Sequence, residues 1–185
     1  TASSALSKAS GGRPRGPNIA GLFAGGTLAA EAQVVLMARR LAVRSNAPVP
    51  GAGRTEGLDL AAGHVLLDLG DDRFTRGRPH PMIEPAVRDQ PMLAALADPK
   101  VGVLLIDVVL GFGSHGDPGG HVAGLLRGQP AVASRPIIIA SVTGTDADPQ
   151  HRARQVAALE AAGVIVAPSN AAAAELAATC VAARS

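Results

Sequence analysis

The sequence is very poor in aromatic residues and in cysteine. Its 185 residues include three Phe, no Trp and no Tyr, which argues against a base-stacking surface or a flavin site, because both depend on aromatic side chains. One cysteine, Cys180, is too few for a disulfide or a thiolate metal cluster and suggests a reducing compartment. No apolar run approaches the roughly 20 residues that a membrane-spanning helix needs, and no signal-peptide pattern is visible. These absences predict a cytoplasmic protein that binds neither nucleic acid nor membranes.

The composition predicts one globular domain. Hydrophobic residues make up 47% of the chain, and 17 basic against 15 acidic residues leave a net charge of +2, too small for a nucleic-acid surface. Residues 1–17 are rich in Ser, Ala, Gly, Pro and Arg, which is typical of a flexible segment or linker. The domain is therefore predicted to span residues 18–185.

Short apolar runs alternate with longer Ala-rich or amphipathic stretches along this domain. The runs have continuous apolar centres, as strands buried on both faces do. They predict strands at 19–24, 64–69, 101–110, 137–142 and 164–167, separated by helices at 27–43, 81–97, 120–126, 149–162 and 170–183. Thr27 and Ser169 are the expected N-caps, and Gly163 is the expected helix stop. Five βα units predict an α/β fold: a flavodoxin-like, doubly wound, five-stranded parallel sheet of order 2-1-3-4-5.

In such folds ligands bind at loops after the carboxyl ends of strands. The first of these loops is Gly25-Gly26-Thr27, where glycines permit close approach and a helix start favours an anion. It matches neither the P-loop nor the G-x-G-x-x-G pattern. A tight turn followed by a capped helix is the alternative interpretation.

The second loop, residues 68–82, is dense in charge and carries His80 between two prolines. Arg76 and Arg78 are the residue type that grips carboxylates and phosphates with two hydrogen bonds. The alternative is that the charges of this loop pair with one another.

The third and fourth loops add further candidates. Asp107, at the end of an apolar run, needs a partner if it is buried, and His115 lies among glycines. Thr143-Gly144-Thr145 offers a second anion cradle before a helix. The geometry of the fold would allow a zinc site formed by His80, His115 and Asp107. No pair of metal ligands spaced along one helix supports such a site, so no metal is predicted.

Taken together, these loops resemble a known family. Gly26-Thr27-Leu28 with Glu31 and the run Asp71-Asp72-Arg73-Phe74-Thr75 occur in the order found in the ligase-CoA domain of the succinyl-CoA synthetase α-subunit. The segments Gly77-Arg78-Pro79-His80-Pro81-Met82, Asp107-Val108-Val109-Leu110-Gly111 and Val142-Thr143-Gly144-Thr145 resemble the FdrA family of acyl-CoA-synthetase-like proteins more closely. The resemblance covers residues 19–183.

The resemblance implies an acyl-CoA synthetase module that handles phosphate or an acyl phosphate, with CoA as a substrate. By this likeness Gly25, Gly26 and Thr27 hold phosphate oxygens. The loop residues themselves predict the other roles: Thr143, Gly144 and Thr145 form a second anion cradle, and Arg76 and Asp72 bind the substrate. Arg78, His80, Asp107 and His115 are the predicted catalytic residues: with Arg76, the first two neutralise charge on the substrate, and the last two orient these groups.

The chain departs from the synthetase pattern in three places. It lacks the His-Ala-Gly turn of the phosphohistidine, and His151 stands in another context. The glutamate that orients the phosphohistidine is missing too, since Val108 falls about at its position and Asp107 one residue earlier. The CoA-binding domain that precedes this module in both families is also absent, so a further domain or partner subunit is expected. The FdrA likeness also suggests part of an oxamate carbamoyltransferase, which uses carbamoyl phosphate. The remaining alternative is a non-catalytic assembly module, and a homo-oligomer is compatible with either function.

Overall fold

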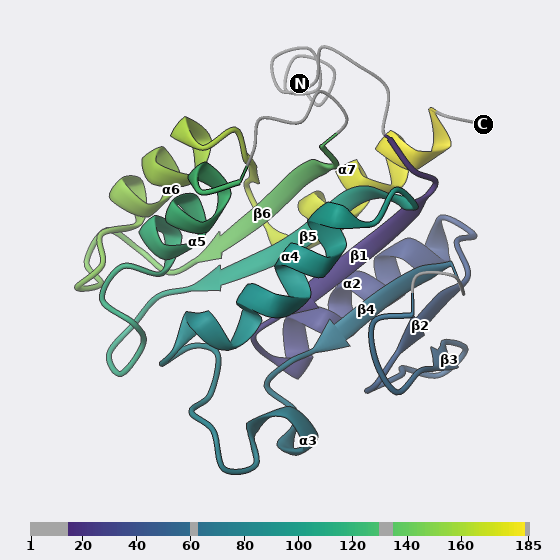
Figure 1. Ribbon diagram of the computed structural model, residues 1–185, viewed down its shortest axis with the longest axis horizontal. Coiled ribbons are helices and arrows are strands. Elements are labelled where there is room, and N and C mark those ends of the chain that lie inside the picture. The colour runs from purple at the N-terminus through teal and green to yellow at the C-terminus, as the bar shows by residue number, and fades with distance from the viewer. Residues whose placement is uncertain (1–14, 60–62, 130–134, 184–185) are drawn as a thin grey trace.

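The computed structural model describes residues 15–59, 63–129 and 135–183. Within these residues it contains one parallel sheet of seven strands in the order β3-β2-β4-β1-β5-β6-β7. The strands are β1 (Asn18–Phe23), β2 (Val43–Ser45), β3 (Gly53–Arg54), β4 (His64–Asp68), β5 (Val101–Val109), β6 (Ile137–Thr143) and β7 (Ile165–Ala167). Figure 1 shows the long central strands running in one direction, so their carboxyl ends lie at one edge.

The five predicted strands correspond to β4, β1, β5, β6 and β7, and their order confirms the doubly wound prediction. The predicted number of strands was too small, because β2 and β3 extend the sheet beyond β4. These two strands have only three and two residues. Elements this short produce no apolar run, so the sequence pattern did not reveal them.

The helices are α2 (Gly26–Ala38), α3 (Asp72–Thr75), α4 (Asp89–Ala97), α5 (Pro118–Arg127), α6 (Arg152–Ala161) and α7 (Asn170–Ala182), with a 3₁₀ turn η2 (Pro85–Arg88). The helix expected to run to residue 43 ends at Ala38, because Arg40 adopts a left-handed φ of 62° before β2 begins. Where a helix was expected from residue 81, η2 begins at Pro85 and continues into α4. None of the helices in the described ranges is long and apolar enough to cross a membrane.

The predicted helix ends were right at the start of α7 and after α6, and wrong at the starts of α2 and α6. The Ser169 hydroxyl caps α7 by accepting a hydrogen bond from the Ala172 N–H at 3.1 Å. Gly163 has a φ of 81° between α6 and β7, as expected of a helix stop. Thr27 is not an N-cap, since α2 begins one residue earlier with Gly25 at the cap position. The helix expected from residue 149 begins at Arg152, because the left-handed His151 precedes it.

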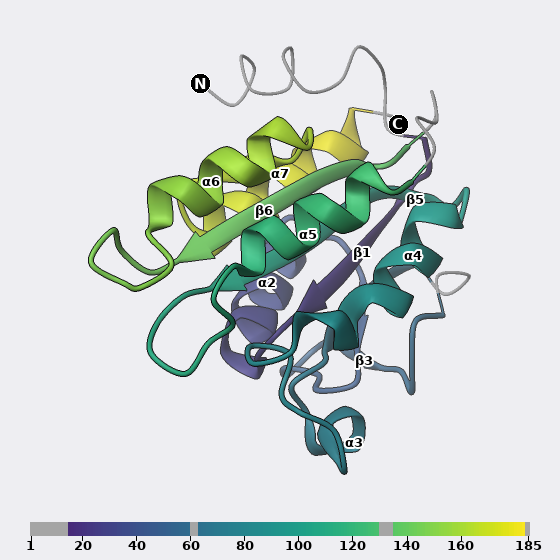
Figure 2. The same ribbon diagram turned by 60° about the vertical axis from the view of Figure 1, so that its left-hand side comes forward.

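The sheet is buried on both faces. Helices α2 and α7 cover one face, and α4, α5 and α6 cover the other (Figures 1 and 2). Along β5, Val103 and Leu105 belong to the first core, whereas Leu104 and Ile106 belong to the second. A strand buried on both faces needs apolar residues at every position, which explains the continuous apolar runs in the sequence.

Candidate functional site at the carboxyl edge of the sheet

The carboxyl ends of β1 and β4 meet beside the start of α2. Phe23 and Asp68 are paired in register, and the chain after Phe23 turns at Gly25 into α2. The start of α2 has no side-chain cap and no acidic residue in its first turn. Amide groups at such a helix start, together with the helix dipole, favour a bound anion. The chain at Gly25, Gly26 and Thr27 therefore forms the helix start that the sequence predicted. That these residues bind an anion stays a prediction.

Asp68 ends β4 directly beside this turn, and Asn46 holds its backbone. The Asn46 side chain donates from Nδ2 to the Asp68 carbonyl at 3.0 Å and accepts from the Asp68 N–H at 2.9 Å. The Asp68 carboxylate accepts a hydrogen bond from the Gly70 N–H at 2.9 Å, and the residue is only 8% exposed. Burial raises the pKa of Asp68, and the charge of Asp71 raises it further, whereas the Gly70 amide and the charge of His80 lower it.

Gly70 brings His80 close to Asp68. A Cβ atom at Gly70 would lie 2.5 Å from the Ala24 carbonyl oxygen, 2.6 Å from His80 Nε2 and 3.2 Å from Asp68 Oδ1. These three groups therefore surround the position that a side chain at residue 70 would occupy, so this position requires glycine. The Met82 N–H donates to His80 Nδ1 at 3.2 Å, which places the proton of the neutral ring on Nε2.

Asp107 lies beneath the turn and is completely buried. Its Oδ1 accepts hydrogen bonds from the Ala24 N–H and from Arg88 Nη1, both at 2.8 Å, and the same guanidinium donates to the Asp107 carbonyl. Burial raises the pKa of Asp107, although the Arg88 charge lowers it. The sequence predicted that Asp107 orients Arg76, Arg78 and His80. Its hydrogen bonds go instead to Ala24 and Arg88, so we assign it the role of anchoring the β1–α2 turn.

The charged loop extends beyond the carboxyl ends of the strands, where Figures 1 and 2 show α3. Asp71 caps α3 by accepting from the Arg73 N–H at 2.9 Å, and Arg73 pairs with Glu56 outside the loop. Asp72, Arg76 and Arg78 are exposed, and within the described ranges no ion pair involves them. The alternative that the charges of this loop pair with one another is therefore not what the structure shows.

His115 belongs to the neighbouring loop between β5 and α5. Its N–H donates to the Met82 carbonyl at 2.8 Å, which ties this loop to the segment that follows His80. Its ring Nδ1 accepts from the Asp117 N–H at 3.1 Å. The buried Gln150 holds the same loop by donating to the carbonyls of Gly111 and His115. No group of three or more His, Cys, Asp or Glu side chains that could hold a metal ion occurs in the part of the chain that the structure describes.

The second predicted cradle already has an internal partner. The N–H and the hydroxyl of Thr145 both donate to Asp148 Oδ2, at 2.6 and 3.1 Å. An anion at Thr143 and Gly144 would therefore have to compete with this carboxylate. Strand β5 separates β6 from β1, which places the loop about 10 Å from the β1–α2 turn at ordinary strand spacing. We therefore centre the candidate site on α2 and β4.

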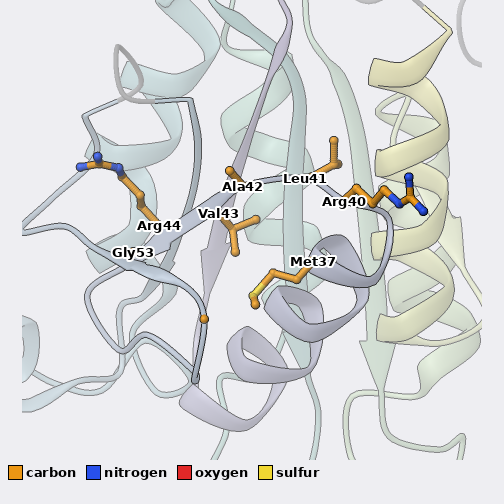
Figure 3. Close-up of a pocket in the computed structure, with 8 residues that line it drawn as sticks. Met37, Arg40, Leu41, Ala42, Val43, Arg44 and Gly53 are labelled. Carbon is orange, nitrogen blue, oxygen red and sulfur yellow. The ribbon is translucent and has the colours of Figure 1, made fainter.

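A hollow of about 550 Å³ lies elsewhere, beside the end of α2 and the first residue of β2. Met37, Leu41, Val43 and two arginines line it. Figure 3 shows that the side chains of Arg40 and Arg44 point away from each other, so their charges do not converge on one ligand. The hollow thus lies at the edge of the sheet where the strands begin. The candidate site lies at the opposite edge, where the strands end.

The structure adds residues that the sequence analysis did not assign. Asp68 carried a usable signal, since it is an acidic residue at the end of an apolar run, as Asp107 is. Asn46 and Arg88 carried none, because their partners lie 22 and 19 positions away in the sequence. Arg88 lies within the helix expected at 81–97, where an arginine is normally a surface residue.

The fold and the site define a flavodoxin-like α/β domain with a candidate anion site at the carboxyl edge of its sheet. The CoA-ligase family model matches residues 22–180, and the chain belongs to this family. It is also similar to the uncharacterized protein YahF of Escherichia coli strain K12, with 40% identity over 162 residues. The matched region covers 85% of this chain and 32% of YahF, so the chain spans about a third of that relative's length.

Proposed function

We propose that this chain is the CoA-ligase-type module of an FdrA-like acyl-CoA synthetase and that it binds the phosphoryl group of an acyl phosphate. The observation that carries this proposal is the uncapped start of α2 beside the Asp68 carboxylate, which His80 approaches in turn, in a chain of the CoA-ligase family. The phosphoryl oxygens would bind at the Gly25, Gly26 and Thr27 amides.

The surrounding side chains suit this chemistry. Cleavage of an acyl phosphate develops negative charge on the phosphoryl oxygens, which fixed hydrogen-bond donors stabilise. His80 offers Nε2–H toward the turn, while Arg76 and Arg78 are exposed on the adjoining loop and available to a ligand. CoA enters as the acyl acceptor that the family name indicates, held by another domain or by a partner subunit.

Transfer from carbamoyl phosphate is the second candidate, because carbamoyl phosphate presents the same phosphoryl group. The observation that favours it is the position of His151, which is exposed on the β6–α6 loop with its ring against the Asp146 carbonyl at 3.1 Å. That loop lies beyond β5 from the proposed site. Direct transfer of the carbamoyl group from carbamoyl phosphate needs no phosphohistidine, so it is compatible with a histidine that lies away from the phosphoryl site. Carbamoyl-phosphate consumption with oxamate, measured beside CoA-dependent acyl-phosphate formation, decides between the two reactions.

Replacement of Gly26 by alanine tests the binding site itself. The new Cβ would lie 2.9 Å from Asp68 Oδ2, within the space assigned to the ligand. Gly26→Ala is expected to weaken phosphate binding about tenfold or more, measured by calorimetric titration. Its folding stability should fall by about 1 kcal/mol at most, the lower end of overpacking, because the new Cβ meets the end of the Asp68 side chain rather than backbone.

Gly124→Ala is the matched control for this experiment. Gly124 is a helical glycine of α5, outside the proposed site, and a Cβ there would approach nothing closer than Arg127 Nη2 at 4.0 Å. Phosphate affinity should therefore be nearly unchanged in Gly124→Ala. Equal phosphate affinity in Gly26→Ala and the original protein would contradict the proposed site and favour the non-catalytic assembly module.

A further inference from the structure

The Asp68 carboxylate is buried at the entrance to the proposed phosphoryl site. Its Oδ2 lies 2.9 Å from the position that a Cβ would take at Gly26, in the first turn of α2. Only 8% of the residue is exposed to solvent. An anion bound at the start of α2 therefore lies beside this carboxylate, where two negative charges repel each other more strongly than they do in water.

His80 lies close to the same carboxylate. Its Nε2 and Asp68 Oδ1 lie 2.6 and 3.2 Å from the single position that a Cβ would take at Gly70. Since Nδ1 accepts the Met82 N–H, a second ring proton would have to displace that hydrogen bond. We therefore assign the proton to Asp68, whose Oδ2 lies beside the first turn of α2.

The surroundings of Asp68 support this assignment. Burial and the Asp71 charge raise the pKa of Asp68, and together they outweigh the Gly70 and Asp71 amides and the His80 charge, which lower it. The first turn of α2 contributes no acidic side chain, and the contact from the end of β2 is the uncharged Asn46. Asp68 thus holds a proton at a higher pH than an ordinary aspartate.

We infer that Asp68 takes up one proton when a phosphoryl group binds at the start of α2, and donates it in a hydrogen bond to a ligand oxygen. This inference rests on the proposed function. The proton comes from solvent, the new O–H bond forms on the Asp68 carboxyl, and no bond of the ligand breaks. Uptake removes the charge repulsion and adds a donor, so ligand affinity is linked to pH.

Sulfate is the probe for this inference, because it remains a dianion across the working pH range and contributes no titration of its own. Calorimetry at a series of pH values between about 5 and 8, in buffers of different ionisation enthalpy, counts the protons taken up. We expect uptake to approach one proton per sulfate once Asp68 is ionised in the free protein. Sulfate affinity should then fall by up to about tenfold per pH unit.

Asp68→Asn should flatten this pH dependence and abolish the proton uptake, since the amide cannot titrate while its oxygen can still accept the Gly70 N–H. Glu84→Gln is the matched control: it removes one charge from an exposed residue beyond His80 and should preserve the slope. Far-UV circular dichroism and urea unfolding verify that each variant is folded. The proton count in the unmodified protein tests the inference even if Asp68→Asn does not fold.

The outcomes separate the inference from the proposed function. Sulfate binding without proton uptake overturns the inference and leaves the site intact. The same holds if uptake persists in Asp68→Asn and is lost in His80→Gln, because the proton then goes to the histidine. No sulfate binding at any pH, in a folded protein, overturns the proposed function as well.

Discussion

Arg88→Met is expected to lower the free energy of unfolding by about 3–5 kcal/mol, which is typical when one partner of a buried ion pair is removed. Arg88 and Asp107 are both almost completely buried, and Nη1 lies 2.8 Å from Oδ1. Methionine fills much of the same volume but leaves the Asp107 carboxylate without its counter-charge. Urea denaturation followed by circular dichroism measures the change.

The loss of unfolding free energy in Arg88→Met should depend on pH in a defined direction. Burial raises the folded-state pKa of Asp107, so its contribution to stability is fully present below the unfolded value of about 4 and is lost as pH rises through the folded value. Without Arg88, which lowers that pKa, the loss extends to higher pH. The difference between Arg88→Met and the original protein should therefore grow once the pH exceeds the folded-state pKa of Asp107 in the original protein. A difference that is constant with pH would exclude this explanation.

A second substitution isolates the charge. Adding Asp107→Asn to Arg88→Met removes the buried charge but keeps an oxygen that can accept the Ala24 N–H. The double variant should recover part of the lost stability, about 1–3 kcal/mol, because an unpaired neutral amide costs less to bury than an unpaired carboxylate. A double variant no more stable than Arg88→Met would assign the loss to packing.

The architecture was predictable because each central strand is buried on both faces. Such a strand has to be continuously apolar, and the run that became β5 shows this directly in the sequence. The two short strands β2 and β3, which extend the sheet beyond β4, were not predictable. Their short segments pair with the sheet through backbone hydrogen bonds, which leave no trace in side-chain pattern.

The place of the candidate site in the fold was predictable from the sequence, whereas only some of the contacts within it were. Glycines at the start of α2 and the charged loop after β4 identified the carboxyl edge, since these loops follow buried strands. The partner of Asp107 was not predictable, because Arg88 reaches it through tertiary packing from η2. The importance of Gly70 was equally hidden, since it depends on the approach of His80 and of the Ala24 carbonyl, which only the folded chain creates.

Gly70→Ala should damage both stability and ligand binding, and stability more than Gly26→Ala does. The new Cβ would lie 2.5 Å from the Ala24 carbonyl oxygen and 2.6 Å from His80 Nε2. A side chain such as His80 can move aside, but the carbonyl belongs to the backbone of the β1–α2 turn, which Asp107 anchors. We expect a loss of about 1–3 kcal/mol in unfolding free energy, as is usual for overpacking.

Because the turn itself has to shift, phosphate affinity should fall about tenfold or more, measured by the same calorimetric titration. Gly116→Ala is the control, since a Cβ at this glycine of the adjacent β5–α5 loop would meet nothing within 4 Å. Adding His80→Ala to Gly70→Ala removes the contact with the ring and leaves the contact with the backbone. The double variant should therefore remain destabilised, and full recovery of its stability would show that the histidine, rather than the Ala24 carbonyl, is what requires glycine at position 70.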